Sequence, residues 1–252
     1  MDFDWTAPYF EKWHICIHPW RLAWCMVLGK VTPLLEKAGH TVYAIDLPGH
    51  GSDQTPISQV SLKSYTDKVC SILDDAEEPV YLVGHSMGGI VISQSAEYRS
   101  EKVKALIFVT AFLLRDGEAM TDIIPTDIEA QVAPNMILFE KEGYATLRED
   151  SLKHVFYGCC DDADVEKAKS LLSPQALNVL STKLSLTEER FGSVPKYYIE
   201  CLRDNAITIQ CQRAMYSANP CEHVYTLDTD HSPFYSKPNE LASILQSIHE
   251  NH

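Results

Sequence analysis

Residues 80–92, VYLVGHSMGGIVI, decide the fold of this chain. An apolar run enters the motif G-x-S-x-G at Gly84, Ser86 and Gly88, and a run with helical spacing leaves it. A serine between a strand and a helix sits on a tight, strained turn that lifts its hydroxyl above a sheet. Glycines flank such a serine because side chains there would collide with neighbouring backbone. The motif alone is a weak signal, but the strand before it and the helix after it indicate that Ser86 is a nucleophile.

Short β-branched or aromatic runs alternate with amphipathic runs on both sides of this motif. The alternation predicts βαβ units and therefore the α/β fold class, with a mostly parallel central sheet flanked by helices. The predicted strands are Thr41–Asp46, Val80–His85, Lys104–Thr110, Pro195–Cys201 and His223–Asp228. The predicted helices are Leu62–Leu73, Met87–Tyr98, Ile207–Met215 and Glu240–His249.

Residues 114–190 interrupt this alternation. The segment is longer than one crossover, and turns at Pro125, Pro134 and Gly158 divide it into several predicted helices. We expect one domain over residues 1–252, with this segment inserted as a helical cap after a central strand. A cap at that point would cover the carboxyl ends of the parallel strands, where open α/β sheets hold their ligands.

The composition of the chain restricts its expected binding partners and cellular location. The 252 residues are 45% hydrophobic, so that the chain can bury a large core. A net charge of -14 repels nucleic acid and anionic membranes, and we expect neither as a partner. With no long apolar run and no secretory signal pattern, we expect a soluble, cytoplasmic protein. The eight cysteines are scattered without zinc-type spacing, which predicts reduced thiols, including the Cys159-Cys160 pair, and no metal site.

A serine nucleophile needs a base, and the base needs an orienting carboxylate. In folds with this serine turn the order along the chain is serine, acid, histidine. Asp204 follows the predicted strand at 195–201, and His231 follows the predicted strand at 223–228. All three side chains can therefore meet at one edge of the sheet. The sequence predicts Ser86, Asp204 and His231 as a catalytic triad.

Other acids and histidines lie near these positions. Asp228 and Asp230 are closer to His231 in sequence, but neighbours on an extended chain point to opposite faces and cannot easily orient the ring. Asp204 is therefore favoured over both. We expect His85, next to the nucleophile, to pack or to face solvent rather than to act as the base.

Four motifs together carry a resemblance to a known family: GHSMGG at 84–89, VTAFL at 109–113, CLRD at 201–204 and DTDH at 228–231. They resemble the α/β-hydrolases that include plant methyl-ester esterases, hydroxynitrile lyases and many bacterial relatives, from about Lys30 to the C-terminus. The resemblance implies the α/β-hydrolase fold, a small apolar or aromatic ester as substrate, no metal and no organic cofactor. The lyases resemble one another in a lysine directly after the catalytic histidine. Ser232 stands there in this chain, which favours ester hydrolysis.

Residues 14–29, HICIHPWRLAWCMVLG, depart from this family. Its members open with an apolar strand and a motif such as HGAWHGAWCW, whose early backbone N–H completes the oxyanion hole with the N–H after the nucleophile. We expect Met87 to supply the latter, and the second donor to come from around Pro19 and Trp20. Proline has no N–H, so the chain could be a weakened enzyme.

A shifted reading frame would explain the departure. If the gene is read one base later, new codons start at the second base of the codons for Trp20, Trp24 and Met26. These new codons encode Gly, Gly and Trp, provided that Arg21 has a CGN codon. These residues match the second, sixth and eighth places of the motif. We therefore hypothesise that residues 14–29 are translated out of frame, with natural divergence as the alternative. The nucleotide sequence of the gene tests this hypothesis.

The sequence thus predicts a serine hydrolase for a small-molecule ester, with Phe112 among the candidate residues of the pocket. A non-catalytic protein that holds a small aromatic acid in the same pocket is an alternative, and a hydroxynitrile lyase is another. The sequence is compatible with a homodimer.

Overall fold

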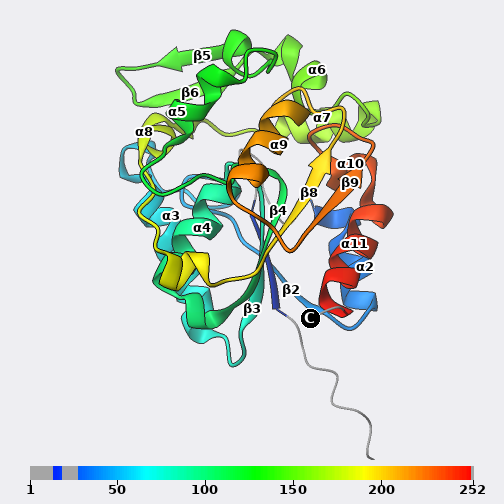
Figure 1. Ribbon diagram of the computed structural model, residues 1–252. Coiled ribbons are helices and arrows are strands. Elements are labelled where there is room, and N and C mark those ends of the chain that lie inside the picture. The colour runs from blue at the N-terminus through cyan, green and yellow to red at the C-terminus, as the bar shows by residue number, and fades with distance from the viewer. Residues whose placement is uncertain (1–13, 19–27, 251–252) are drawn as a thin grey trace, which may run out of the picture.

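The computed structural model describes residues 14–18 and 28–250 of the protein, which form an α/β architecture (Figure 1). A six-stranded sheet has the order β2-β1-β3-β4-β8-β9, and every neighbouring pair in it is parallel. Its strands are β1 His14–His18, β2 Thr41–Ala44, β3 Val80–Ser86, β4 Val103–Ala111, β8 Lys196–Cys201 and β9 His223–Leu227. The strands β3 and β4 at its centre are almost wholly buried, which explains their near-continuous apolar sequences.

Helices cover both faces of this sheet. In Figure 1, α3 and α4 lie on one side, and α2 and α11 lie on the other. The helices around the sheet are α2 Thr32–Lys37, α3 Leu62–Asp75, α4 Gly88–Tyr98, α9 Ile209–Ala218, α10 Pro233–Ser236 and α11 Pro238–Glu250. In the described part of the chain, no helix is both long and apolar enough to cross a membrane.

The predicted elements around the sheet are present, with ends displaced by three residues at most. The largest displacement is at the end of α9, which continues to Ala218 rather than ending at Met215. The start of α9 is set by Thr208, the N-cap, whose hydroxyl oxygen accepts the N–H of Cys211 at 3.3 Å. Strand β1 was not among the predicted strands. It lies between β2 and β3, so the backbone at 14–18 takes a central place in the sheet although its sequence departs from the family.

The cap lies between β4 and β8 in the sequence and beyond the carboxyl ends of the strands in space (Figure 1). Its helices are α5 Met120–Ile123, α6 Leu152–Phe156, α7 Asp162–Ser170 and α8 Leu177–Ser181. The π-helical turn at Glu188–Gly192 instead packs against the end of α4, where Arg190 donates to the carbonyl of Glu97 at 3.1 Å.

The prediction of a purely helical cap was incomplete, because the cap also contains an antiparallel sheet of three strands. These strands are β5 Met136–Phe139, β6 Tyr144–Leu147 and β7 Gln175–Ala176. Gly143, with φ of 77°, closes the β5–β6 hairpin, and its N–H donates to the carbonyl of Phe139 at 2.8 Å. Strands this short carry too few residues for periodicity to distinguish them from helix.

Candidate active site

Ser86 ends strand β3 on a strained turn. Its φ is 54°, in the left-handed region that residues other than glycine rarely adopt. A Cβ at Gly84 would lie 2.9 Å from the carbonyl of Gly88, and one at Gly89 would lie 2.3 Å from the carbonyl oxygen of Phe112. Close backbone contacts therefore require these glycines, as expected for a turn that presents a serine at the edge of the sheet.

The neighbouring strand β4 changes its pairing with β3 at this turn. The register between β3 and β4 shifts after His85, so that Ser86 pairs with Ala111. The N–H of Phe112 then donates to the carbonyl of Ser86 at 3.0 Å. The turn is thus held from both sides, by the start of α4 and by the end of β4.

Asp204 and His231, from the loops after β8 and β9, are in direct contact. The Nδ1 of His231 lies 2.6 Å from Oδ2 of Asp204, and both side chains are almost fully buried. The other carboxylate oxygen accepts the backbone N–H groups of Ala206 at 2.6 Å and Ile207 at 3.0 Å. The hydroxyl of Thr110 donates to Oδ2 as well. Several donors therefore surround the buried carboxylate and satisfy both of its oxygens.

The two alternative acids have other partners. Asp228 is exposed and forms an ion pair with Arg203 at 2.9 Å. The buried Asp230 accepts the N–H of Cys159 at 2.6 Å and a hydroxyl hydrogen from Ser236 at 3.0 Å. Of the three aspartates near the histidine in sequence or space, Asp204 is the one paired with Nδ1 of its ring.

His85 connects the histidine loop to the serine turn. Its Nε2 donates to the carbonyl oxygen of His231 at 2.7 Å, and the two rings are 4.5 Å apart between centroids. Burial, together with the nearby His231, holds the pKa of His85 well below its usual value, so that the ring is neutral. Residue 231 therefore packs against the residue that precedes Ser86.

A mostly apolar cavity opens at Ser86. Phe112 lines it from the end of β4, and Ala206, Ile207 and Cys211 line it from the region after Asp204. The cap contributes the remaining lining side chains, which are Met120, Ile124, Asp127, Ala130, Val132 and Ala133. Such a lining suits a small apolar group placed next to the hydroxyl. The ring of Phe156, also from the cap, lies 5.3 Å from that of His231.

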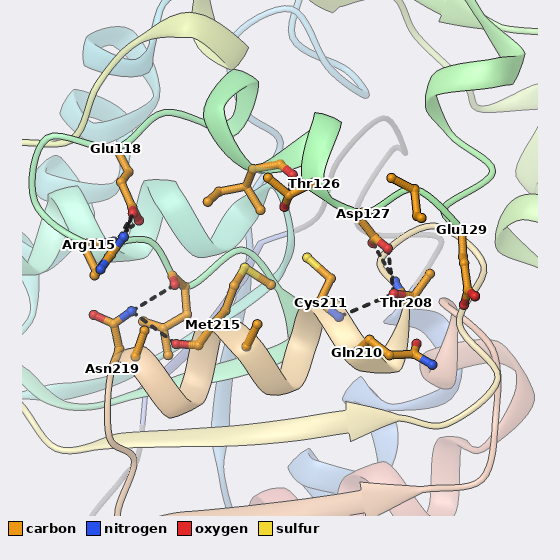
Figure 2. Close-up of a pocket in the computed structure, with 15 residues that line it drawn as sticks. Arg115, Glu118, Thr126, Asp127, Glu129, Thr208, Gln210, Cys211, Met215 and Asn219 are labelled. Atoms are coloured by element: carbon orange, nitrogen blue, oxygen red, sulfur yellow. Dashed lines mark hydrogen bonds and ion pairs between the residues drawn. The ribbon is translucent and has the colours of Figure 1, made fainter.

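An open groove of about 460 Å³ lies next to this cavity (Figure 2). Asp127 and Cys211 line both spaces and therefore stand between them. The carboxylate of Asp127 accepts the N–H of Thr208 at 2.9 Å and its hydroxyl hydrogen at 2.6 Å, as Figure 2 shows. Asp127 thus fastens the cap to the start of α9, close to the loop that carries Asp204.

The remaining site predictions have separate outcomes. Met87 is buried directly after Ser86, at the beginning of α4. Pro19 and Trp20 lie outside the described residues, so the second oxyanion donor stays a prediction and the shifted frame stays a hypothesis. Among the residues that the structure describes, no three His, Cys, Asp or Glu side chains are grouped to hold a metal ion, and the cysteines, Cys159 and Cys160 included, are free.

Thr110 was not among the predicted site residues, although it lies within the motif VTAFL at 109–113. A hydroxyl at the end of an apolar strand was the available signal, but nothing local shows that it faces an aspartate 94 positions later.

Comparisons with known proteins agree with this architecture. The model of the "Alpha/beta hydrolase family" matches residues 15–244. Methylesterase 7 of Arabidopsis thaliana is 32% identical over 239 residues, which cover 90% of this chain and 91% of the relative. A solved pyrethroid hydrolase from Sphingobium faniae JZ-2 has a TM-score of 0.85 at 28% identity and covers 95% of this chain and 98% of its own. A solved Arabidopsis methylesterase has a TM-score of 0.84 at 23% identity, with coverage of 95% and 100%, and shows the fold alone.

Proposed function

The chain belongs to the alpha/beta hydrolase family, and from this premise we propose that it is a serine carboxylic-ester hydrolase for small apolar or aromatic esters. The observation that carries the proposal is the buried pair of His231 and Asp204 beside the strained turn at Ser86. Hydrolases named as methylesterases are among the relatives, which supports an esterase. The cytoplasmic location and the homodimer stay predictions.

The proposed reaction begins at Ser86. Its hydroxyl attacks the ester carbonyl while Nε2 of His231 takes the proton, and the carbonyl oxygen becomes an oxyanion. The N–H of Met87 stabilises that oxyanion. The protonated His231 then donates to the departing alcohol, which leaves an acyl group on Ser86. Water attacks this acyl-enzyme with His231 again as the base, and the acid is released.

Asp204 acts through the histidine. Its Oδ2 accepts a hydrogen bond from Nδ1–H, which keeps that proton on Nδ1 and leaves the lone pair of Nε2 free to accept the proton of Ser86. The protonated ring that forms during attack is stabilised because the carboxylate is already hydrogen-bonded and held in place before the reaction begins.

The cavity favours esters with a small apolar portion. Its lining includes the small side chains of Ala130, Ala133 and Ala206, and Ile124 and Ile207 give it apolar walls. Methyl and aryl esters of short or aromatic acids fit this description, and a panel of such esters would rank them by kcat/KM.

Replacement of the nucleophile tests the proposal. We expect Ser86→Ala to reduce kcat/KM on p-nitrophenyl acetate by at least about a thousandfold, since the acyl-enzyme can no longer form. Ser95→Ala is the matched control, because Ser95 is a buried serine of α4 that does not line the cavity. Equal rates for the wild type and Ser86→Ala would exclude the serine mechanism and leave the non-catalytic binding protein. Cyanide release from mandelonitrile would instead support the lyase.

A further inference from the structure

Thr110 has an unusual backbone for its residue type. In the described part of the chain, Ser86 and Thr110 are the residues other than glycine with positive φ, at 54° and 37°. A β-branched side chain is particularly unfavourable there, so that the surrounding structure must impose this conformation. Ser86 has a functional reason for its strained turn, and the structure suggests one for Thr110.

Neighbours on both sides fix the backbone at Thr110. On one side, Ser86 pairs with Ala111, and the ladder between β3 and β4 omits Thr110. On the other side, the hydroxyl of Tyr198 on β8 donates to the carbonyl of Ala111 at 2.8 Å and accepts its N–H at 3.1 Å. Tyr198 is fully buried, so this clamp is rigid.

The conformation directs the hydroxyl of Thr110 at the carboxylate of Asp204. The hydroxyl donates to Oδ2, the same oxygen that accepts from Nδ1 of His231. Oδ1 is held by two backbone N–H groups of its own loop. Thr110 is thus the contact that joins the acid loop to the strand beside the nucleophile.

We propose that Thr110 is a positioning residue, whose hydroxyl holds the carboxylate of Asp204 in the orientation that accepts a hydrogen bond from Nδ1–H of His231. The proposal rests on the roles proposed above for Asp204 and His231. Without this hydroxyl, one of the donors that fix the carboxylate is lost, and the ring is held less firmly in the orientation that presents Nε2 to Ser86.

Other titratable groups lie close to His231 and Asp204, and they must be the same in the wild type and in any variant that is compared with it. His85 on β3 packs against the ring of His231. Tyr198 and Cys201 on β8, and Cys211 on α9, are near enough to Asp204 for its charge to raise their pKa values, after the larger effect of burial. Asp230 directly precedes His231. None of them changes when Thr110 is replaced.

Two variants separate the hydroxyl from the packing. Thr110→Val keeps the size and the β-branch and removes the hydroxyl, whereas Thr110→Ser keeps the hydroxyl and removes a methyl group. The NMR resonance of the Nδ1 proton of His231, assigned by its loss in His231→Gln, reports on the hydrogen bond to Asp204 without substrate. We expect this resonance to broaden or move upfield in Thr110→Val and to stay at the wild-type position in Thr110→Ser.

The same pair has a kinetic readout. We expect kcat/KM for p-nitrophenyl acetate to fall roughly tenfold in Thr110→Val, mainly through kcat, and to be nearly unchanged in Thr110→Ser. In an Asp204→Asn background, Thr110→Val should cause little further loss, because its effect passes through the carboxylate.

A wild-type Nδ1–H resonance of His231 in Thr110→Val, or an equal change in Thr110→Ser, would overturn the proposal. Should Thr110→Val fail to fold, Thr110→Ala removes both the hydroxyl and the γ-methyl group, and its comparison with Thr110→Ser isolates the hydroxyl. The NMR measurement needs no catalysis, so its failure is distinct from the failure of the hydrolase assignment, which Ser86→Ala tests.

Discussion

The loops that follow β8 and β9 each bury an aspartate close to His231, and the two aspartates have different partners. Asp204 and Asp230 are 5% and 2% exposed, so both carboxylates are removed from water. Asp204 receives the imidazole N–H. Asp230 instead accepts the N–H of Cys159 in the cap, the N–H of Ser232 and the hydroxyl of Ser236.

Burial and proximity in sequence therefore do not identify the acid of the proposed triad. Asp230 precedes His231 on the chain, but its side chain does not pair with the ring. It accepts the N–H of Cys159 instead and so connects the histidine loop to the cap. Asp204 is 27 positions away and reaches the ring across two neighbouring strand ends. The donors around each carboxylate, rather than its depth, distinguish a group that acts on the imidazole from one that holds the loop.

The largest expected effect follows replacement of the first carboxylate. Asp204→Asn should reduce kcat/KM on p-nitrophenyl acetate by about 10⁴-fold, because an amide N–H facing Nδ1 makes that atom an acceptor and places the proton on Nε2. Nε2 could then no longer take the proton of Ser86. Kinetics of the purified variant measure the loss, and circular dichroism checks the fold. Activity close to wild type would remove Asp204 from the proposed mechanism.

Replacement of the second carboxylate should act mainly on stability. Asp230→Asn places amide hydrogens against existing donors, such as the N–H groups of Cys159 and Ser232, so we expect the free energy of unfolding to fall by about 1–3 kcal/mol. Well below the melting temperature, kcat/KM should stay within roughly tenfold of wild type. Urea denaturation and kinetics would be measured on the same samples.

The exposed Asp228 provides the control for this comparison. Asp228→Asn removes a surface ion pair with Arg203 and should change the free energy of unfolding by less than about 1 kcal/mol. If Asp230→Asn matched Asp204→Asn in lost activity without lost stability, the proposed division between the two carboxylates would be wrong.

The stability of the chain should also depend on pH through His85. Burial and His231 hold the pKa of His85 below its unfolded value of about 6.5, so that at lower pH the unfolded chain binds a proton that the folded one does not. This group therefore decreases stability as pH falls from about 7 to 5, by up to about 1.4 kcal/mol per pH unit. His40, whose pKa burial also lowers, acts in the same direction.

His85→Gln separates the two histidines. Glutamine can still donate to the carbonyl of His231 but does not titrate, so the slope of unfolding free energy against pH should be flatter between pH 7 and 5. Urea denaturation at several pH values would measure it. An unchanged slope would show that His85 makes no contribution to this dependence.

The sequence predicted the elements around the sheet well and the cap poorly, for a physical reason. The βαβ alternation repeats one local pattern, so strands such as β4 and helices such as α3 could be read from periodicity. The short strands of the cap, Met136–Phe139 among them, are stable only because they pair with each other. The pairing residues of β6 and β7 lie about 30 positions apart in the sequence, and no local pattern encodes such pairing.

The same division applies to the candidate site. The sequence by itself determined the turn at Ser86, because its glycines are required by backbone contacts within a few residues or across one strand, and it determined that Asp204 and His231 follow strand ends. Only the tertiary structure decided that Nδ1 of His231 faces Asp204, and that Thr110 donates to the same oxygen. Steric demands of a tight turn act locally, whereas hydrogen-bond partners of a buried carboxylate depend on how separate strands come together.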